Sequence, residues 1–173
     1  MKSNPKSIPV ALALVGVIVL GAEPDAKATS QRSHNGLQGT WRVTVTPYNC
    51  STRMPLGVPF HALLSFSRGG TLSGASSNSG FQPGQYSASF GIWRQTGQLT
   101  YSAVTDAFIL FSGGPFPAGT QEIRHSIHVS ANGNRFIDDA SVHYFDVTDV
   151  PIPPQAPLIP GCATAAGQRL EWP

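Results

Sequence analysis

Apolar and polar residues alternate with a period of two along eight short stretches of the chain. The stretches are rich in Val, Ile, Thr, Phe and Tyr, and clusters of Gly, Asn, Ser and Pro separate them. This pattern is typical of antiparallel strands with one face in a core and one in solvent. The predicted strands cover residues 40–46, 60–67, 71–76, 87–95, 98–111 (with a bulge), 120–130, 135–146 and 162–172. The sequence therefore predicts an all-β fold, an eight-stranded antiparallel up-and-down barrel whose interior holds side chains or one small ligand.

Three residue pairs are expected to form tight turns between these strands. Gly69 with Gly70, Thr96 with Gly97, and Asn132 with Gly133 offer the positive φ angles that two-residue hairpin turns need. The last pair sets a register in which Ser130 lies opposite Arg135, and the alternation then sorts both strands into faces.

The inner face predicted in this way is mostly apolar and forms the candidate ligand-binding surface. On the fourth and fifth strands, Phe90 and Ile92 are expected to meet Tyr101 and Ala103 inside, which leaves Trp93 on the outer face. The predicted lining consists of Phe60, Leu64, Phe66, Ile92, Tyr101, Ile123, His125, Ile127, Phe136, Asp138, Val142 and Tyr144.

The first 28 residues have the layout of a secretory signal peptide. Lys2 and Lys6 precede an apolar run over residues 8–22 that is short for a membrane span. Ala26 and Ala28 form an Ala-Lys-Ala site, so cleavage is predicted after Ala28. Cleavage after Ala22 and an uncleaved anchor helix are the alternatives. We therefore expect a signal peptide over 1–28, a single β-barrel domain over 29–173, and a secreted or periplasmic protein without a membrane span after cleavage.

Export bears on the two cysteines, Cys50 and Cys162. Disulfides form and persist outside the cytoplasm, so the sequence predicts a bridge between them, with two free buried thiols as the alternative.

Charge argues against a nucleic-acid partner. All three lysines fall within the predicted leader, and the rest of the chain has eight arginines and seven acidic residues without a basic cluster. The sequence indicates no oligomeric state.

Residues 37–41, Leu-Gln-Gly-Thr-Trp, resemble the Gly-x-Trp signature that opens the first strand of lipocalins and the wider calycin group. In that family an arginine near the end of the last strand packs across the tryptophan at the closed end of the barrel. The resemblance implies a calycin-like barrel with Gly39, Trp41 and Arg169 in these structural positions. The pair Trp41 and Arg169 and the pair Cys50 and Cys162 fit one antiparallel register of the first and last strands to within two residues.

Only one pair of side chains in the predicted interior suggests chemistry. His125 and Asp138 lie diagonally on adjacent strands, and a buried carboxylate beside an imidazole can handle protons. The alternative is that the two groups only satisfy each other's hydrogen bonds. No His, Cys or acidic spacing suggests a metal site, no cofactor motif occurs, and the Gly-x-Ser-x-Gly motif is absent.

The predicted function is binding of a small apolar or amphipathic ligand in the barrel lumen. A barrel enzyme, such as an isomerase, cyclase or hydrolase that uses His125 and Asp138, is the second possibility. A secreted interaction or inhibitor protein that acts through residues 53–59 and the proline-rich segment 151–160 is the third. The sequence leaves catalysis undecided and favours binding.

Overall fold

The computed structural model describes residues 36–153 and 161–172, so the predicted signal peptide lies outside the described residues. The described chain is all β and contains no helix. Its strands are β1 Gly39–Tyr48, β2 Phe60–Phe66, β3 Thr71–Ser76, β4 Ser89–Gln95, β5 Thr100–Ile109, β6 Gly119–Val129, β7 Arg135–Asp146, β8 Pro151–Ile152 and β9 Cys162–Arg169.

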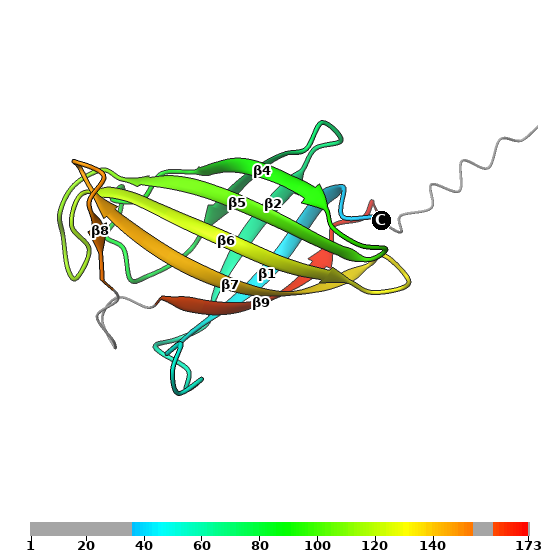
Figure 1. The fold of residues 1–173 in the computed structure, drawn as a ribbon, viewed down its shortest axis with the longest axis horizontal. Coiled ribbons are helices and arrows are strands. Elements are labelled where there is room, and N and C mark those ends of the chain that lie inside the picture. The colour runs from blue at the N-terminus through cyan, green and yellow to red at the C-terminus, as the bar shows by residue number, and fades with distance from the viewer. Residues whose placement is uncertain (1–35, 154–160, 173) are drawn as a thin grey trace, which may run out of the picture. The chain divides into compact units, whose positions relative to one another are not determined.

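Eight of these strands close into an antiparallel up-and-down barrel (Figure 1). Neighbours in sequence pair from β1 to β7, β9 pairs with β7, and β9 also pairs with β1. The two-residue β8 adds only a short pairing at the end of β7. Trp41 lies opposite Arg169 in the β1–β9 ladder, which confirms the predicted closure and its register. The closed eight-stranded sheet is compatible with a calycin-like fold.

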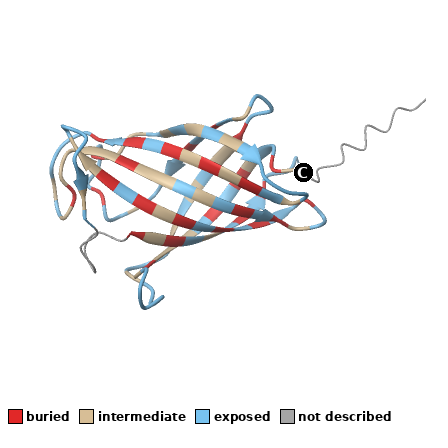
Figure 2. Ribbon diagram, viewed as in Figure 1, coloured by how far each residue is buried: buried red, intermediate tan, exposed pale blue. Residues whose placement is uncertain are grey.

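Burial alternates along the strands as the period-two pattern predicts (Figure 2). In β7, for example, every second residue from Phe136 to Tyr144 is buried. The alternation exists because successive side chains in a strand point to opposite faces of the sheet, and here only the inner face is shielded from water.

All three predicted turns lie in hairpin connections, but not all have the predicted length. The β6–β7 hairpin has the predicted register, with Val129 opposite Phe136, and Gly133 has a φ of 72°. The β2–β3 turn is one residue longer than predicted: Ser67 bonds to Thr71, and only Gly70 has a positive φ, 82°. This geometry is a type I turn followed by a glycine bulge.

The two-residue turn predicted at Thr96 and Gly97 is wrong, and this error exchanges the inward-facing and outward-facing residues of β4. A longer connection joins β4 to β5, so Ile92 lies opposite Val104 instead of Tyr101. This is a shift of an odd number of residues, and such a shift moves every side chain to the other face.

As a result, the predicted interior positions of Phe90 and Ile92 are wrong. Both side chains are 67% exposed on the outside of the barrel. Trp93, predicted outside, packs against the core, with ring centroids 5.8 Å from Tyr101 and 6.1 Å from Phe66. The expected bulge in the fifth strand is also absent, because β5 pairs without interruption from Thr100 to Ile109.

One end of the barrel is closed by a packed core around Trp41. The Arg169 guanidinium lies 4.2 Å from the centroid of the Trp41 ring and donates hydrogen bonds to the carbonyls of Gly36, Gln38 and Gly133. Gly39 has a φ of 119°, and a Cβ at this position would meet the Arg169 guanidinium at 2.7 Å. The glycine therefore permits both the backbone conformation and the close approach of the arginine.

Candidate functional site

A cavity occupies the interior beyond this closed end. Its volume is about 100 Å³, counted as the space open to the centres of water molecules. Small inward side chains create it: Ala62 on β2, Ala140 on β7, and Ala163 and Ala165 on β9 all lie on its wall. Larger side chains at these positions would fill the lumen, so the cavity is a direct consequence of alanine at inward-facing positions.

Aromatic rings gather at the other end of the cavity. Phe81 stacks on Tyr86 with ring centroids 4.5 Å apart and on Phe116 at 4.2 Å, and Phe116 lies 5.6 Å from Tyr144. Phe81 and Tyr86 belong to the segment between β3 and β4, and Phe116 belongs to the β5–β6 connection. These two connections therefore partly cover the cavity.

Gln85 joins the two connections. Its side chain is fully buried, its Nε2 donates to the carbonyls of Phe111, Gly113 and Phe116, and its Oε1 accepts a bond from the Gln82 amide. Since loop carbonyls have no strand partner, one glutamine satisfies several buried polar groups at once.

A chain of polar side chains crosses the aromatic end of the cavity. The Tyr86 hydroxyl donates to Gln121 Oε1 at 2.6 Å, and Gln121 Nε2 donates to the Tyr144 hydroxyl at 2.8 Å. Burial raises the pKa of Tyr144 to about 12 and raises the pKa of Tyr86 as well, with a further contribution from Tyr144. Both phenols therefore remain neutral hydrogen-bonding groups at physiological pH.

His125 and Asp138 meet on the cavity wall. The His125 Nδ1 and Asp138 Oδ2 atoms are 2.6 Å apart, and the side chains are only 9% and 2% exposed. Asp138 Oδ1 also accepts the Ser126 amide at 3.0 Å. Because a carboxylate oxygen accepts, the imidazole donates from Nδ1 in this pair, and in the neutral ring the Nε2 atom is then the acceptor.

Thr105, which the sequence analysis did not single out, completes this group. Its Oγ1 lies 3.3 Å from His125 Nε2, its residue is 2% exposed, and it lines the same cavity. One signal could have found it: Thr105 has the same parity on its strand as the interior residues Tyr101 and Ala103. Because a bulge was expected in that strand, the alternation was not continued from Ala103 to Thr105.

The twelve residues of the predicted lining fall into three groups. Seven line the cavity: Phe60, Leu64, Ile123, His125, Asp138, Val142 and Tyr144. Four lie in the packed core around Trp41: Phe66, Tyr101, Ile127 and Phe136. Ile92 lies on the outer surface and cannot contribute to a site inside the barrel.

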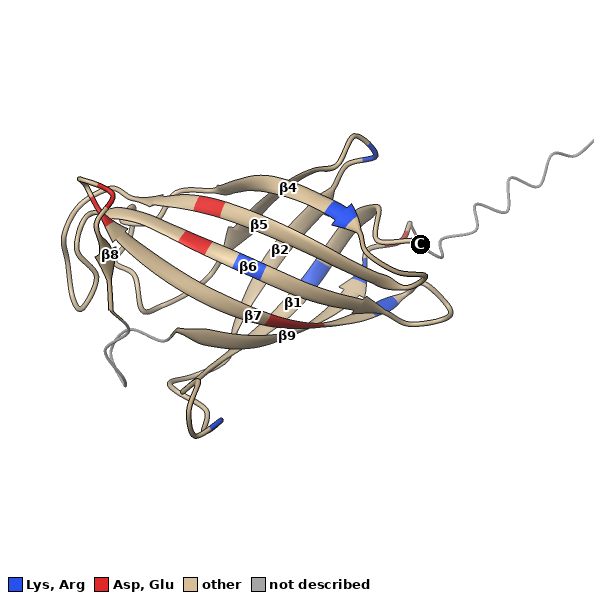
Figure 3. Cartoon of the chain, in the orientation of Figure 1, with Lys and Arg blue, Asp and Glu red and all other residues tan. Residues whose placement is uncertain are grey.

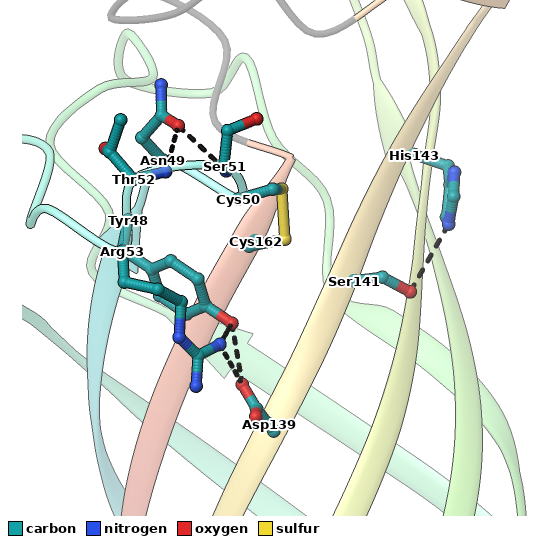
Figure 4. Close-up of a disulfide and its surroundings, with 10 residues drawn as sticks. All are labelled: Tyr48, Asn49, Cys50, Ser51, Thr52, Arg53, Asp139, Ser141, His143 and Cys162. Atoms are coloured by element: carbon teal, nitrogen blue, oxygen red, sulfur yellow. Dashed lines mark hydrogen bonds and ion pairs between the residues drawn. A yellow bond between two sulfur atoms is a disulfide. The ribbon is translucent and has the colours of Figure 1, made fainter.

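Cys50 and Cys162 form the predicted disulfide, with Cα atoms 5.3 Å apart, beside the cavity (Figure 4). Next to it, the Tyr48 hydroxyl donates to Asp139 Oδ1 at 2.7 Å, and the Arg53 guanidinium lies 4.6 Å from the Tyr48 ring centroid. The hydrogen bond from Tyr48, followed by Arg53, lowers the pKa of Asp139. These contacts hold the β1–β2 loop against β7.

The same loop was expected to matter if the protein acts through a loop interface. Its Met54 and Val58 are 65% and 79% exposed. A solid core would favour an interaction or inhibitor protein, but the barrel contains a cavity. Residues 154–160 of the proline-rich segment lie outside the described residues.

Charged side chains are scattered over the strands without a basic cluster (Figure 3). In the part of the chain that the structure describes, no three His, Cys, Asp or Glu side chains come together as metal ligands do. Among the same residues, no helix is long and apolar enough to cross a membrane.

Comparison with protein-family models gives no match, and comparison with curated proteins gives no match either. The function must therefore be inferred from the cavity itself.

Proposed function

We propose that this protein is an exported barrel that binds one small, neutral, mostly apolar molecule in its cavity. The observation that carries the proposal is a partly covered cavity of about 100 Å³ whose mostly apolar wall contains two polar groups: Thr105 with His125 and Asp138, and the Tyr86–Gln121–Tyr144 chain. Ligand sites commonly combine such apolar walls with a few polar groups that orient the guest.

The volume limits the size of the ligand. About 100 Å³ of the cavity is open to the centres of water molecules, which is room for a small molecule and not only for a single water. A compact ring compound fits this limit, whereas a long acyl chain or a large pigment exceeds it.

The charges of the wall favour a neutral ligand. The acid and the imidazole of the wall, Asp138 and His125, already pair with each other, and no Lys or Arg among the described residues lines the cavity. An anion would therefore be buried without a free counter-charge, which is costly.

The acceptor at His125 Nε2 defines the preferred polar group. Its contact with Thr105 Oγ1 is long for a hydrogen bond, at 3.3 Å, so a hydroxyl or N–H of a ligand can compete for the nitrogen. We infer that the ligand carries one hydrogen-bond donor on an apolar body.

Two further observations support an extracytoplasmic setting. Structural disulfides such as Cys50–Cys162 persist in oxidising compartments, and residues 1–28 have the layout of a signal peptide. The Gly39 and Trp41 motif with Arg169 packed on the tryptophan supports a relationship to lipocalin-like carriers.

Binding of 4-fluorophenol, followed by fluorine NMR, tests the proposal. This neutral phenol should bind with one molecule per chain, whereas 4-fluorobenzoate, an anion of similar size, should bind at least about tenfold more weakly. Ala163→Leu, which adds volume at the cavity wall, should weaken phenol binding by about tenfold or more.

Ala166→Leu is the matched control, because Ala166 lies on the outer face of the same strand. Binding that is equally strong in both variants, or no binding of the phenol to the wild-type protein, would refute the proposal.

A further inference from the structure

Three neighbouring strands bring a hydroxyl, an imidazole and a carboxylate into one line. Ala103 on β5 lies opposite His125 on β6, and His125 lies opposite Ala140 on β7. Thr105 and Asp138 are each two residues away from those partners, on opposite sides of the ring, so each is a diagonal neighbour of His125. Diagonal neighbours on one face are close enough for long side chains to touch.

The hydrogen bonds give each group a distinct role. Asp138 is held by the Ser126 amide and accepts the proton of His125 Nδ1, which orients the ring. The Nε2 atom of the ring then faces Thr105 Oγ1 at 3.3 Å. A base within reach of a hydroxyl and oriented by a third group is the geometry of an activated nucleophile, and the distance is commonly longer before substrate binds.

We propose that Thr105 is a nucleophile for acyl transfer from small neutral esters, with His125 as general base and Asp138 as its positioning residue. This inference rests on the proposed function, since the ester must enter the same cavity. The cavity also sets the substrate class, which is a small uncharged ester with a compact body.

The reaction takes place in two balanced steps. Thr105 Oγ1 attacks the ester carbonyl while His125 Nε2 takes the hydroxyl proton, and collapse of the intermediate breaks the ester C–O bond as the imidazolium returns that proton to the leaving alcohol. Water then attacks the acyl-threonine, again with His125 as base, and releases the carboxylic acid and the free hydroxyl. No oxidant, reductant or metal is needed.

Two features of β4 suit this chemistry. Gly91 lies opposite Thr105, so no side chain of β4 covers the hydroxyl at that position. Ser89, two residues from Gly91, lines the cavity, and its side-chain hydroxyl makes no hydrogen bond within the described residues. This hydroxyl is the donor that we assign to the developing oxyanion.

The barrel contains no lysine side chain that could compete with Thr105 for the acyl group. The amino-acid sequence places all three lysines at positions 2, 6 and 27, within the predicted leader. The amines that usually compete for reactive esters are therefore absent from the barrel, apart from the chain terminus.

The test uses 4-fluorophenyl acetate, whose release of 4-fluorophenol is followed by fluorine NMR while intact-protein and peptide mass spectrometry locate an acetyl group. The wild-type protein should acquire an acetyl group on Thr105 and release phenol. Thr105→Val should abolish the adduct, and Thr105→Ser should retain it, because serine keeps the hydroxyl. His125→Gln should slow acetylation by about 10²-fold or more, and Ser89→Ala should slow it by about 10²-fold.

Thr164→Val, on the outer face of β9, is the matched control and should acetylate like the wild-type protein. Binding of 4-fluorophenol is measured for every variant, which separates the two proposals. If the wild-type protein binds 4-fluorophenol but shows neither an acetyl group on Thr105 nor phenol release that Thr105→Val abolishes, the nucleophile is overturned and the binding function stands. If the wild-type protein shows neither binding nor acetyl transfer, both proposals are overturned.

Discussion

Gln85 shows how much a single buried polar residue can determine in this molecule. It has no exposed surface, and its amide joins two connections at the aromatic end of the cavity. Arg169 has a similar role at the closed end, where it combines stacking on Trp41 with bonds to carbonyls. In both cases one planar side chain satisfies several backbone groups that no strand can reach.

The two buried tyrosines predict how stability depends on high pH. Burial raises the pKa of Tyr144 to about 12 and also raises the pKa of Tyr86, whereas both ionise near pH 10 in the unfolded chain. Above pH 10 the unfolded state therefore binds fewer protons than the folded state, and stability falls as pH rises. Between pH 9 and 11 these residues should together cost about 2 to 3 kcal/mol in urea unfolding.

The variant Tyr86→Phe, Tyr144→Phe provides the comparison. It should start less stable at pH 9, because Gln121 loses both partners, but it should lose less stability on the way to pH 11. Equal losses in the two proteins would contradict the assignment.

At the scale of elements, β4 shows that turn length decides which face of a strand is buried. Its residues alternate as a strand should, but both faces carry large apolar side chains: Phe90 and Ile92 on one, Trp93 on the other. Composition could not choose between them. The length of the β4–β5 connection determines which face is buried, since it places Trp93 opposite Ala103 on the inner face.

Substitutions on β4 test which of its two faces is buried. Ile92→Thr should change the free energy of unfolding by less than about 0.5 kcal/mol, because Ile92 is exposed and threonine suits a strand. Trp93→Ala should cost about 2 to 4 kcal/mol, because it removes contacts with Phe66 and Tyr101 and the bonds from Nε1 to the Ser67 and Thr71 carbonyls. Urea unfolding measures both, and the reverse order would contradict the register.

For the whole molecule, closure of the sheet is the decisive event. Pairing of β1 with β9 removes both sheet edges and converts one face of the sheet into an interior. Because the strands run up and down, the β1–β2, β3–β4 and β5–β6 connections all lie at the same end. The disulfide joins the end of β1 to the start of β9, so it reinforces the closing pair of strands.

Removing the disulfide should therefore weaken the whole barrel. The variant Cys50→Ser, Cys162→Ser should lose about 2 to 5 kcal/mol of unfolding free energy, since the bridge spans 112 residues of sequence and restricts the unfolded chain. The wild-type protein treated with reductant should show the same loss in urea unfolding. Unchanged stability in both would show that strand pairing alone secures the closure.

Much of the site could be predicted from one well-chosen turn. The Asn132 and Gly133 turn set the β6–β7 register, and that register placed His125 and Asp138 together on the inner face. Thr105 was missed because its strand was expected to contain a bulge. The cavity itself could not be predicted, because its volume depends on how alanines of β2, β7 and β9 face one another across the barrel.

The amino-acid sequence by itself determined the all-β class and the strands, because these follow from local alternation and turn chemistry. It also indicated the disulfide, because the chain has only two cysteines, and the closing register, through that pair and the resemblance that places Trp41 beside Arg169. Only the tertiary structure decided which face of β4 is buried, how much of the lumen stays open, and which hydroxyl faces His125. Those properties depend on contacts between strands that are distant in sequence, and a shift of one residue in any ladder would change them.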